Sequence, residues 1–179
     1  MRVYFVRHGE SLSNTGPHDG RDAGDELTDR GWEQAQSIGS RLANEELTHL
    51  YVSPMQRAQE TAAAILESVD VPVTHLDYIH EIIRAESTYN RDPKTTDLGE
   101  VLHTYWHQMA DASPDERTEQ AESFSDIRDR VQRLLDRLLE DAPESAVVVT
   151  HGGFLRVLLG MTIRGTSFGP SDIPDFMKV

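Results

Sequence analysis

The chain has 179 residues and a formal net charge of −14, with 37% hydrophobic and 27% charged residues and no cysteine. This length favours a single domain, over residues 1–179, with a proper hydrophobic core. The acidity argues against partners that select cationic surfaces, so we expect binding neither to nucleic acid nor to membranes, and the missing cysteines exclude disulfides, thiolate catalysis and cysteine-ligated zinc.

The apolar stretches of the chain are short. None reaches the roughly 18 residues that a membrane-spanning helix needs, and the first one runs into a polar motif too early for a signal peptide. A cytoplasmic location fits these features.

The first half of the chain alternates between strand-like and helix-like segments. Thr28 is expected to cap the first helix through its hydroxyl, and Pro54 is expected in the first turn of the second helix, where its missing N–H costs little. The patterns predict strands at residues 2–6, 48–53 and 71–76 and helices at residues 28–44 and 54–69.

The second half begins with an irregular, charged stretch and then resumes the alternation. The acidic run at residues 113–122 is interpreted as a solvated linker. Helices are predicted at 97–112, 124–141 and 154–161, and a continuous apolar strand at 146–150. In the helix at 97–112, the inward residues are expected to be Leu98, Leu102, Tyr105, Trp106 and Met109. Alternating strands and helices predict an α/β fold, a three-layer α/β/α sandwich with a mostly parallel central sheet.

Three strand ends carry unusual polar residues. The first strand runs into Arg7-His8-Gly9, the second ends in Ser53 with Arg57 one helical turn later, and the late strand runs into His151-Gly152-Gly153. Since sites in parallel sheets form at the carboxyl ends of strands, we expect these ends to converge on one pocket.

The residue types at these ends suit a phosphoryl group. Arginine offers planar, bidentate donors that match phosphate oxygens, and the backbone N–H groups of Gly152 and Gly153 can bind an anion at a helix start. A histidine among such donors can act as a nucleophile and carry the phosphoryl group covalently. The neighbouring cations keep its imidazole neutral.

Four motifs in this order carry a family resemblance. The chain resembles the histidine phosphatase superfamily, also called the phosphoglycerate mutase-like family, from residue 2 to about residue 161. The resemblance implies a phosphoglycerate mutase-like fold and phosphoryl chemistry on a histidine. The motifs are Arg7-His8-Gly9-Glu10, Leu27-Thr28-x-x-Gly31, Ser53-Pro54-x-x-Arg57-Ala58-x-x-Thr61 and Thr150-His151-Gly152-Gly153.

The resemblance also implies roles for single residues. His8 matches the phosphorylated nucleophile, and Arg7, Arg57 and His151 match the groups that hold the phosphate and its transition-state charge. Asn14 matches a polar residue near the phosphate, although a role in stabilising a turn stays open for it.

The proton donor of the family usually follows the third strand, where this chain has Glu81. Here the sequence departs from the family pattern, because many members continue with a glycine-containing segment and this chain reads Ile82-Ile83-Arg84-Ala85-Glu86. Glu86 is therefore the reserve candidate for the acid, and a solvated loop carboxylate is the alternative interpretation of Glu81.

Two further groups of residues leave alternatives open. His103 and His107 lie four residues apart on a predicted helix, a spacing that can hold a metal, but no third ligand is evident, so packing or lining the substrate side of the pocket is preferred. Two interpretations are open for Arg84, Arg91 and Lys94. They either belong to an ordinary solvated loop or bind the non-phosphate end of an anionic substrate. We predict no metal site and no cofactor.

The leading prediction is a metal-independent phosphatase that hydrolyses phosphomonoesters, with a small-molecule phosphorylated substrate. A phosphoglycerate mutase, a protein phosphohistidine phosphatase and a catalytically silent phosphate-binding module are the alternatives. A homodimer is compatible with the sequence, and the substrate itself is left open.

Overall fold

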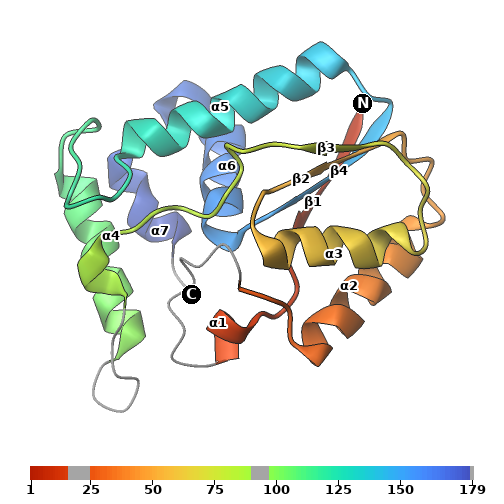
Figure 1. Ribbon diagram of the computed structural model, residues 1–179. Coiled ribbons are helices and arrows are strands. Elements are labelled where there is room, and N and C mark those ends of the chain that lie inside the picture. The colour runs from red at the N-terminus through yellow and green to blue at the C-terminus, as the bar shows by residue number, and fades with distance from the viewer. Residues whose placement is uncertain (16–24, 90–96, 178–179) are drawn as a thin grey trace. The chain divides into compact units, whose positions relative to one another are not determined.

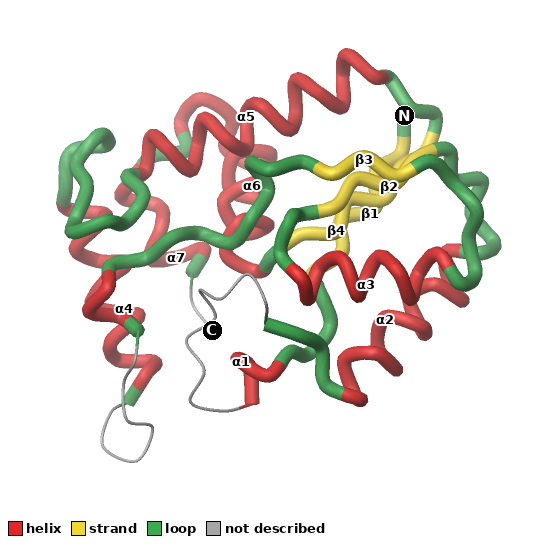
Figure 2. The backbone as a smooth tube through the Cα atoms, in the orientation of Figure 1, coloured by secondary structure: helices red, strands yellow, loops and turns green. Residues whose placement is uncertain are grey.

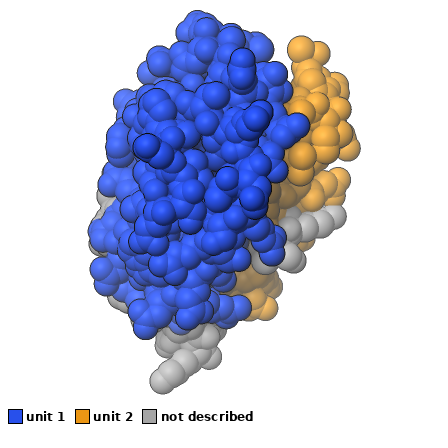
Figure 3. Space-filling view, turned by 90° about the vertical axis from the view of Figure 1, so that its right-hand side faces the viewer, with its two compact units in different colours: residues 1–81, 133–152 blue, residues 82–132, 153–179 orange. Residues whose placement is uncertain are grey.

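The computed structural model describes residues 1–15, 25–89 and 97–177. Its contacts divide the chain into two compact units, one of residues 1–81 and 133–152 and the other of residues 82–132 and 153–179 (Figure 3). Each unit is therefore discontinuous in sequence. The expectation of one domain stays a prediction.

The first unit contains a four-stranded, fully parallel sheet (Figures 1 and 2). Its strand order is β1-β4-β2-β3, and the register places Phe5 beside Val148 and Tyr51 beside the same residue on the other side. Every residue of β4 is buried, as a central strand of a parallel sheet requires. The strands are β1 (Arg2–Arg7), β2 (His49–Val52), β3 (Val73–His75) and β4 (Ser145–Thr150).

Helices α2 (Asp29–Leu42) and α3 (Gln56–Leu66) cover one face of this sheet (Figure 1). Thr28 caps α2 as predicted, because its side chain accepts the Gly31 N–H. The expectation for Pro54 is wrong, since Met55 is the N-cap of α3 and the proline lies before it. The core on this face consists of Leu42, Leu50, Val52, Ala58, Ala62, Ile65, Val147 and Val149.

The end of α5 (Phe124–Asp141) covers the opposite face of the sheet in the same unit. Leu134 and Leu138 are buried there, and Tyr51 donates its hydroxyl to the Asp141 carboxylate at 2.6 Å. The predicted α/β fold, with helical layers on both faces of a parallel sheet, is thereby confirmed.

The second unit is helical in the residues that the structure describes. In α4 (Leu98–Asp111), Tyr105 and Trp106 are buried, as predicted. The expectation that Leu98 faces inward is wrong, because Leu98 lies on the first turn and is 51% exposed. Around the first part of α5, this unit contains η1 (Glu86–Thr88), α4 (Leu98–Asp111), most of α6 (Gly152–Arg164), η2 (Gly165–Ser167), η3 (Pro170–Asp172) and α7 (Ile173–Phe176). The short helix α1 (Leu12–Thr15) belongs to the first unit.

The acidic run before α5 is only partly a solvated linker. Residues 113–120 are exposed, as predicted, but Glu122 is largely buried in an ion pair with Arg130, with both side chains 12% exposed. Sequence patterns do not reveal such a partner, because it lies eight residues away on a helix. Within the described ranges, no helix is long and apolar enough to span a bilayer.

Candidate active site

The carboxyl ends of β1 and β4 bring two histidines together in the first unit. The strands pair up to Arg7 and Thr150, and the His8 N–H then donates to the Thr150 carbonyl at 3.0 Å. The ring centroids of His8 and His151 lie 5.1 Å apart. The neighbouring strand β2 leads to Arg57, so three of the expected strand ends meet at one site.

The surroundings of His8 select one tautomer of its ring. Nδ1 lies 2.7 Å from the Gly9 carbonyl oxygen, which can only accept a hydrogen bond, so Nδ1 carries the proton. On the other side of the ring, Arg57 donates its Nε–H to Nε2 at 3.3 Å. Nε2 is therefore unprotonated and presents its lone pair, which is the form a nucleophilic imidazole needs.

The electrostatics of the pocket keep this ring neutral. His8 is 7% exposed, and burial, followed by the charges of Arg57 and Arg7, lowers its pKa from 6.5 to about 4. The hydrogen bond to Gly9 and the charge of Glu81 oppose this shift. Burial is the largest cause because removing water disfavours the charged imidazolium.

The two arginines of the site differ in exposure. Arg57 is 2% exposed and forms an ion pair with Asp25, with Nη1 and Oδ2 3.5 Å apart and both side chains almost fully buried. Arg7 is exposed, and its guanidinium forms no hydrogen bond or ion pair among the described residues. It lies beside Gly152, where an added Cβ would be 3.4 Å from Nε. Arg57 is thus held in place by its buried partners, whereas the Arg7 side chain is exposed.

Two motif glycines, Gly9 and Gly31, allow the loop of residues 8–10 to pack on the first turn of α2. A Cβ on Gly9 would overlap the Gly31 carbonyl, and a Cβ on Gly31 would overlap the Glu10 carbonyl. Thr61 secures the same loop, because its hydroxyl accepts the Gly9 N–H at 3.0 Å and donates to the Arg57 carbonyl at 2.7 Å. Motif spacing flagged Thr61, but only the structure reveals this role.

His151 is completely buried at the end of β4. Its Nε2 lies 2.7 Å from the Ser53 hydroxyl, and the same hydroxyl accepts the Met55 N–H at 3.3 Å. Ser53 therefore fixes the imidazole against the start of α3. Ser53 belongs to a sequence motif, but the motif does not predict its contact with His151. No sequence pattern predicts that Asp25 pairs with Arg57.

Asn14 lies in the first unit as part of a local turn. Its Oδ1 accepts the Ser11 N–H at 3.1 Å, and its own N–H donates to the Ser11 carbonyl at 2.9 Å. The side chain is exposed. The turn-stabilising role is thus visible in the geometry, and a role at the phosphate stays a prediction.

The two candidate acids lie in different units. Glu81 belongs to the unit that holds His8, is partly buried, and its charge acts on the His8 pKa. Two residues before it, the Ile79 carbonyl accepts the Thr150 hydroxyl at 2.6 Å, which ties this segment to the end of β4. Glu86 is exposed at the start of η1 in the other unit. The charge of Glu81, which acts on His8, favours it as the candidate acid.

The remaining candidates belong to the second unit. His103 and His107 are exposed on α4 with their Nε2 atoms 3.1 Å apart, so the expected packing beside the buried Tyr105 and Trp106 is wrong, and the alternative, that they line the substrate side of the pocket, stays a prediction. Arg84 stacks over the Tyr89 ring at 4.6 Å. Arg91 and Lys94 lie outside the described residues. No group of three or more potential metal-ligating side chains occurs in the described part of the chain.

The sequence and the fold were compared with known proteins. The chain matches the model of the histidine phosphatase superfamily (branch 1) over residues 3–169. It is 30% identical over 167 residues to the adenosylcobalamin/alpha-ribazole phosphatase of Escherichia coli (strain K12), covering 91% of this chain and 79% of the relative. It is 29% identical over 167 residues to a probable phosphoglycerate mutase of Erwinia tasmaniensis, covering 92% and 75%.

A solved structure with the same fold is a putative alpha-ribazole-5'-P phosphatase from Escherichia coli. Its TM-score is 0.73 at 28% sequence identity, over 92% of this chain and 80% of that chain. An alpha-ribazole phosphatase of Escherichia coli therefore occurs among both the sequence relatives and the solved structures.

Proposed function

The chain belongs to the histidine phosphatase superfamily, and on this premise we propose that it hydrolyses phosphomonoesters through a phosphohistidine on His8. One observation carries the proposal. His8 donates from Nδ1 to the Gly9 carbonyl, which leaves Nε2 unprotonated, and its lone pair accepts a long hydrogen bond from Arg57 that an incoming phosphoryl group can displace.

In the first step, Nε2 of His8 attacks the phosphorus atom and the bond from phosphorus to the ester oxygen breaks. The leaving alkoxide takes a proton from the protonated carboxyl of Glu81 and departs as an alcohol. Arg7 and Arg57 bind the equatorial oxygens, where charge is spread in the transition state. The products of this step are an alcohol and phospho-His8.

In the second step, a water molecule attacks the phosphorus atom of phospho-His8. The carboxylate of Glu81 takes the proton of this water, the N–P bond breaks, and its electron pair returns to Nε2. Inorganic phosphate leaves, and both His8 and Glu81 regain their initial protonation states. The imidazole of His151, which Ser53 holds in place, donates a hydrogen bond to the transferring group.

The arginines supply the positive charge that divalent metals supply in many phosphoryl-transfer enzymes. We therefore propose that turnover needs no metal and no cofactor.

A small-molecule phosphomonoester is the proposed substrate class. A cavity of about 570 Å³ in the first unit touches Arg7, His8 and Gly9, but most of its lining comes from α2 and none of it from Arg57, His151 or Glu81, so the proposal of a small-molecule substrate does not rest on it. The names of the phosphatase relatives support hydrolysis and suggest alpha-ribazole 5'-phosphate for the first assay. The mutase relative keeps transfer back to an organic acceptor as the second candidate.

The experiment combines a substrate panel with a trap for the intermediate. Sugar phosphates, nucleotides, phosphoglycerates, alpha-ribazole 5'-phosphate and a phosphohistidine peptide are assayed in ¹⁸O-labelled water. We expect label in the released phosphate and an alkali-stable, acid-labile phosphoenzyme that His8→Ala abolishes. Turnover by folded His8→Ala, with no phosphoenzyme in the wild type, overturns the covalent mechanism. Exchange between two organic phosphates without label from water identifies a mutase.

A further inference from the structure

Ile83 and Glu122 bind each other through two hydrogen bonds within the second unit. The Ile83 N–H donates to Oε2 of Glu122 at 2.9 Å, and the Glu122 N–H donates to the Ile83 carbonyl at 2.9 Å. Ile83 is two residues after Glu81. A carboxylate from the acidic run thus holds the backbone directly after the candidate proton donor.

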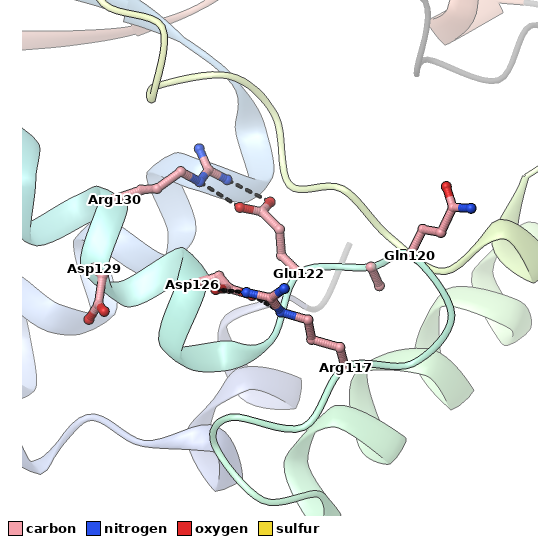
Figure 4. A pocket seen from close by; sticks show the side chains of 7 residues that line it. Arg117, Gln120, Glu122, Asp126, Asp129 and Arg130 are labelled. Carbon is pink, nitrogen blue, oxygen red and sulfur yellow. Dashed lines mark hydrogen bonds and ion pairs between the residues drawn. The ribbon is translucent and has the colours of Figure 1, made fainter.

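The Glu122 carboxylate is itself fixed by Arg130 on α5. Arg130 donates from Nε to Oε1 at 2.6 Å and from Nη2 to Oε2 at 2.7 Å, and both side chains are 12% exposed. Figure 4 shows Glu122 extending from its loop to this guanidinium, and both residues line a cavity of about 380 Å³. A bidentate pair of this kind restricts the rotamers of both side chains. The oxygen that accepts from Ile83 therefore has a defined position.

The segment has a second tether on the other side of Glu81. The Thr150 hydroxyl holds the Ile79 carbonyl at 2.6 Å, next to His151 at the end of β4. Glu81 therefore lies midway between two anchored residues, Ile79 and Ile83. Each tether restricts the backbone on its own side of Glu81, that of Ile79 within the first unit and that of Ile83 within the second unit.

We propose that Glu122 is a positioning residue for Glu81 and acts by anchoring the Ile83 backbone. This inference rests on the proposed role of Glu81 as proton donor. Proton transfer to a leaving group depends steeply on placement, and a displacement of about 1 Å can cost about 100-fold in rate. Loosening the Ile83 anchor should therefore impair the acid without removing it.

The readout is the ratio of kcat/KM for an alkyl phosphate to kcat/KM for p-nitrophenyl phosphate. An alkoxide must be protonated as it leaves, whereas nitrophenolate is stable without a proton, so only the first substrate senses the acid. A general loss of packing lowers both values and leaves the ratio unchanged. A misplaced Glu81 lowers the ratio.

Glu122→Gln is the test variant, because its amide has a single acceptor oxygen, so an NH2 group would face the Arg130 Nε–H in place of Oε1 and break the bidentate pair that fixes the oxygen bound to Ile83. We expect the ratio to fall about tenfold or more. Glu122→Asp keeps the charge that faces Arg130 but shortens the reach to Ile83, so it carries the same expectation if the glutamine variant does not fold.

The matched control is Arg117→Gln. Arg117 lines the same cavity and forms a bidentate pair with Asp126 at the first turn of α5 (Figure 4). Its side chain is 63% exposed, and neither partner bonds to residues 82–89 among the described residues. This variant should leave the ratio unchanged.

A double variant separates positioning from other effects. If Glu122 acts through Glu81, then Glu122→Gln should not lower the ratio further in a Glu81→Gln background. An unchanged ratio in folded Glu122→Gln or Glu122→Asp, or an additive loss in the double variant, overturns the inference while the phosphohistidine mechanism stands. An unchanged ratio in Glu81→Gln itself refutes the acid role of Glu81 and, with it, any positioning by Glu122.

Discussion

Arg57 donates its Nε–H to Nε2 of His8 at 3.3 Å, so a buried cation faces the atom that we propose as the nucleophile. The guanidinium disfavours protonation of that nitrogen and also provides donors for the oxygens of the incoming phosphoryl group. In the proposed mechanism, one side chain therefore both activates the nucleophile and binds the anion. Asp25 balances the charge of that side chain from the other side.

The ring of His8 should stay neutral far into the acid range. Its pKa is lowered to about 4, against 6.5 for the unfolded chain, mainly by burial. NMR titration of ring-labelled protein should therefore give a His8 signal that titrates near pH 4, and His8→Asn assigns the signal by removing it. A His8 midpoint above pH 6 would contradict this environment.

The same shift makes stability depend on pH with a defined sign. Between pH 6.5 and about 4 the unfolded chain binds a proton at His8 that the folded chain does not. The free energy of unfolding should therefore fall as the pH falls through this window, by up to about 3 kcal/mol from this residue. Urea unfolding at several pH values should find a smaller loss in His8→Asn than in the wild type.

Gly31→Ala should destabilise the protein strongly. The new Cβ would overlap the Glu10 carbonyl, which is backbone and cannot rotate away, so α2 and the loop of residues 8–10 must separate. Overpacking of this kind typically costs about 1–3 kcal/mol. Gly169→Ala is the control, because nothing lies within 4 Å of its added Cβ and its backbone is extended. Equal midpoints of denaturation for the two variants would contradict the tight packing.

Asp25→Asn should cost about 3 kcal/mol of stability, because it leaves the buried charge of Arg57 without its counter-ion. The exposed pair Arg128–Asp129 provides the comparison, and Asp129→Asn should change stability by less than about 1 kcal/mol. Urea denaturation at pH 7.5 measures both. Similar values for the two variants would mean that Arg57 is balanced by other groups.

Glu81→Gln should separate substrates by their leaving group. Hydrolysis of an alkyl phosphate should fall by about 10²–10⁴-fold, the usual contribution of general acid catalysis, while p-nitrophenyl phosphate is largely spared. The variant should also accumulate phospho-His8, because the same carboxylate activates water in the second step. Equal losses on both substrates, with no accumulated phosphoenzyme, would transfer the role to Glu86, and Glu86→Gln is then the next variant.

Activity should persist in a chelator and be inhibited by vanadate. Two arginines supply the charge that a metal would supply, and vanadate adopts the five-coordinate geometry of the transferring phosphoryl group. Steady-state assays with EDTA, and vanadate titrations of the wild type and Arg7→Ala, measure this. Activity that is lost in EDTA and restored by a divalent ion would refute metal independence.

Much of the arrangement follows from local patterns. The continuous apolar run of β4 and the amphipathic stripe of α5 depend on burial periodicity, and the hydroxyl of Thr28 identifies the start of α2. The motifs at the strand ends placed His8, Arg57 and His151 at one edge of the sheet, because parallel strands bring their carboxyl ends together. These predictions need only the chain order and the geometry of strands and helices.

Partnerships between distant residues were decided by the tertiary structure. The Asp25 counter-ion of Arg57 and the Ser53 contact of His151 join residues far apart in the chain, which no periodicity encodes. The acidic run before α5 looked like a solvated linker, yet Glu122 binds Ile83 and Arg130. Sequence by itself therefore determined which groups the chemistry can use. Only the folded backbone decided how each group is held, because burial and hydrogen-bond partners depend on distances that arise after the chain has packed.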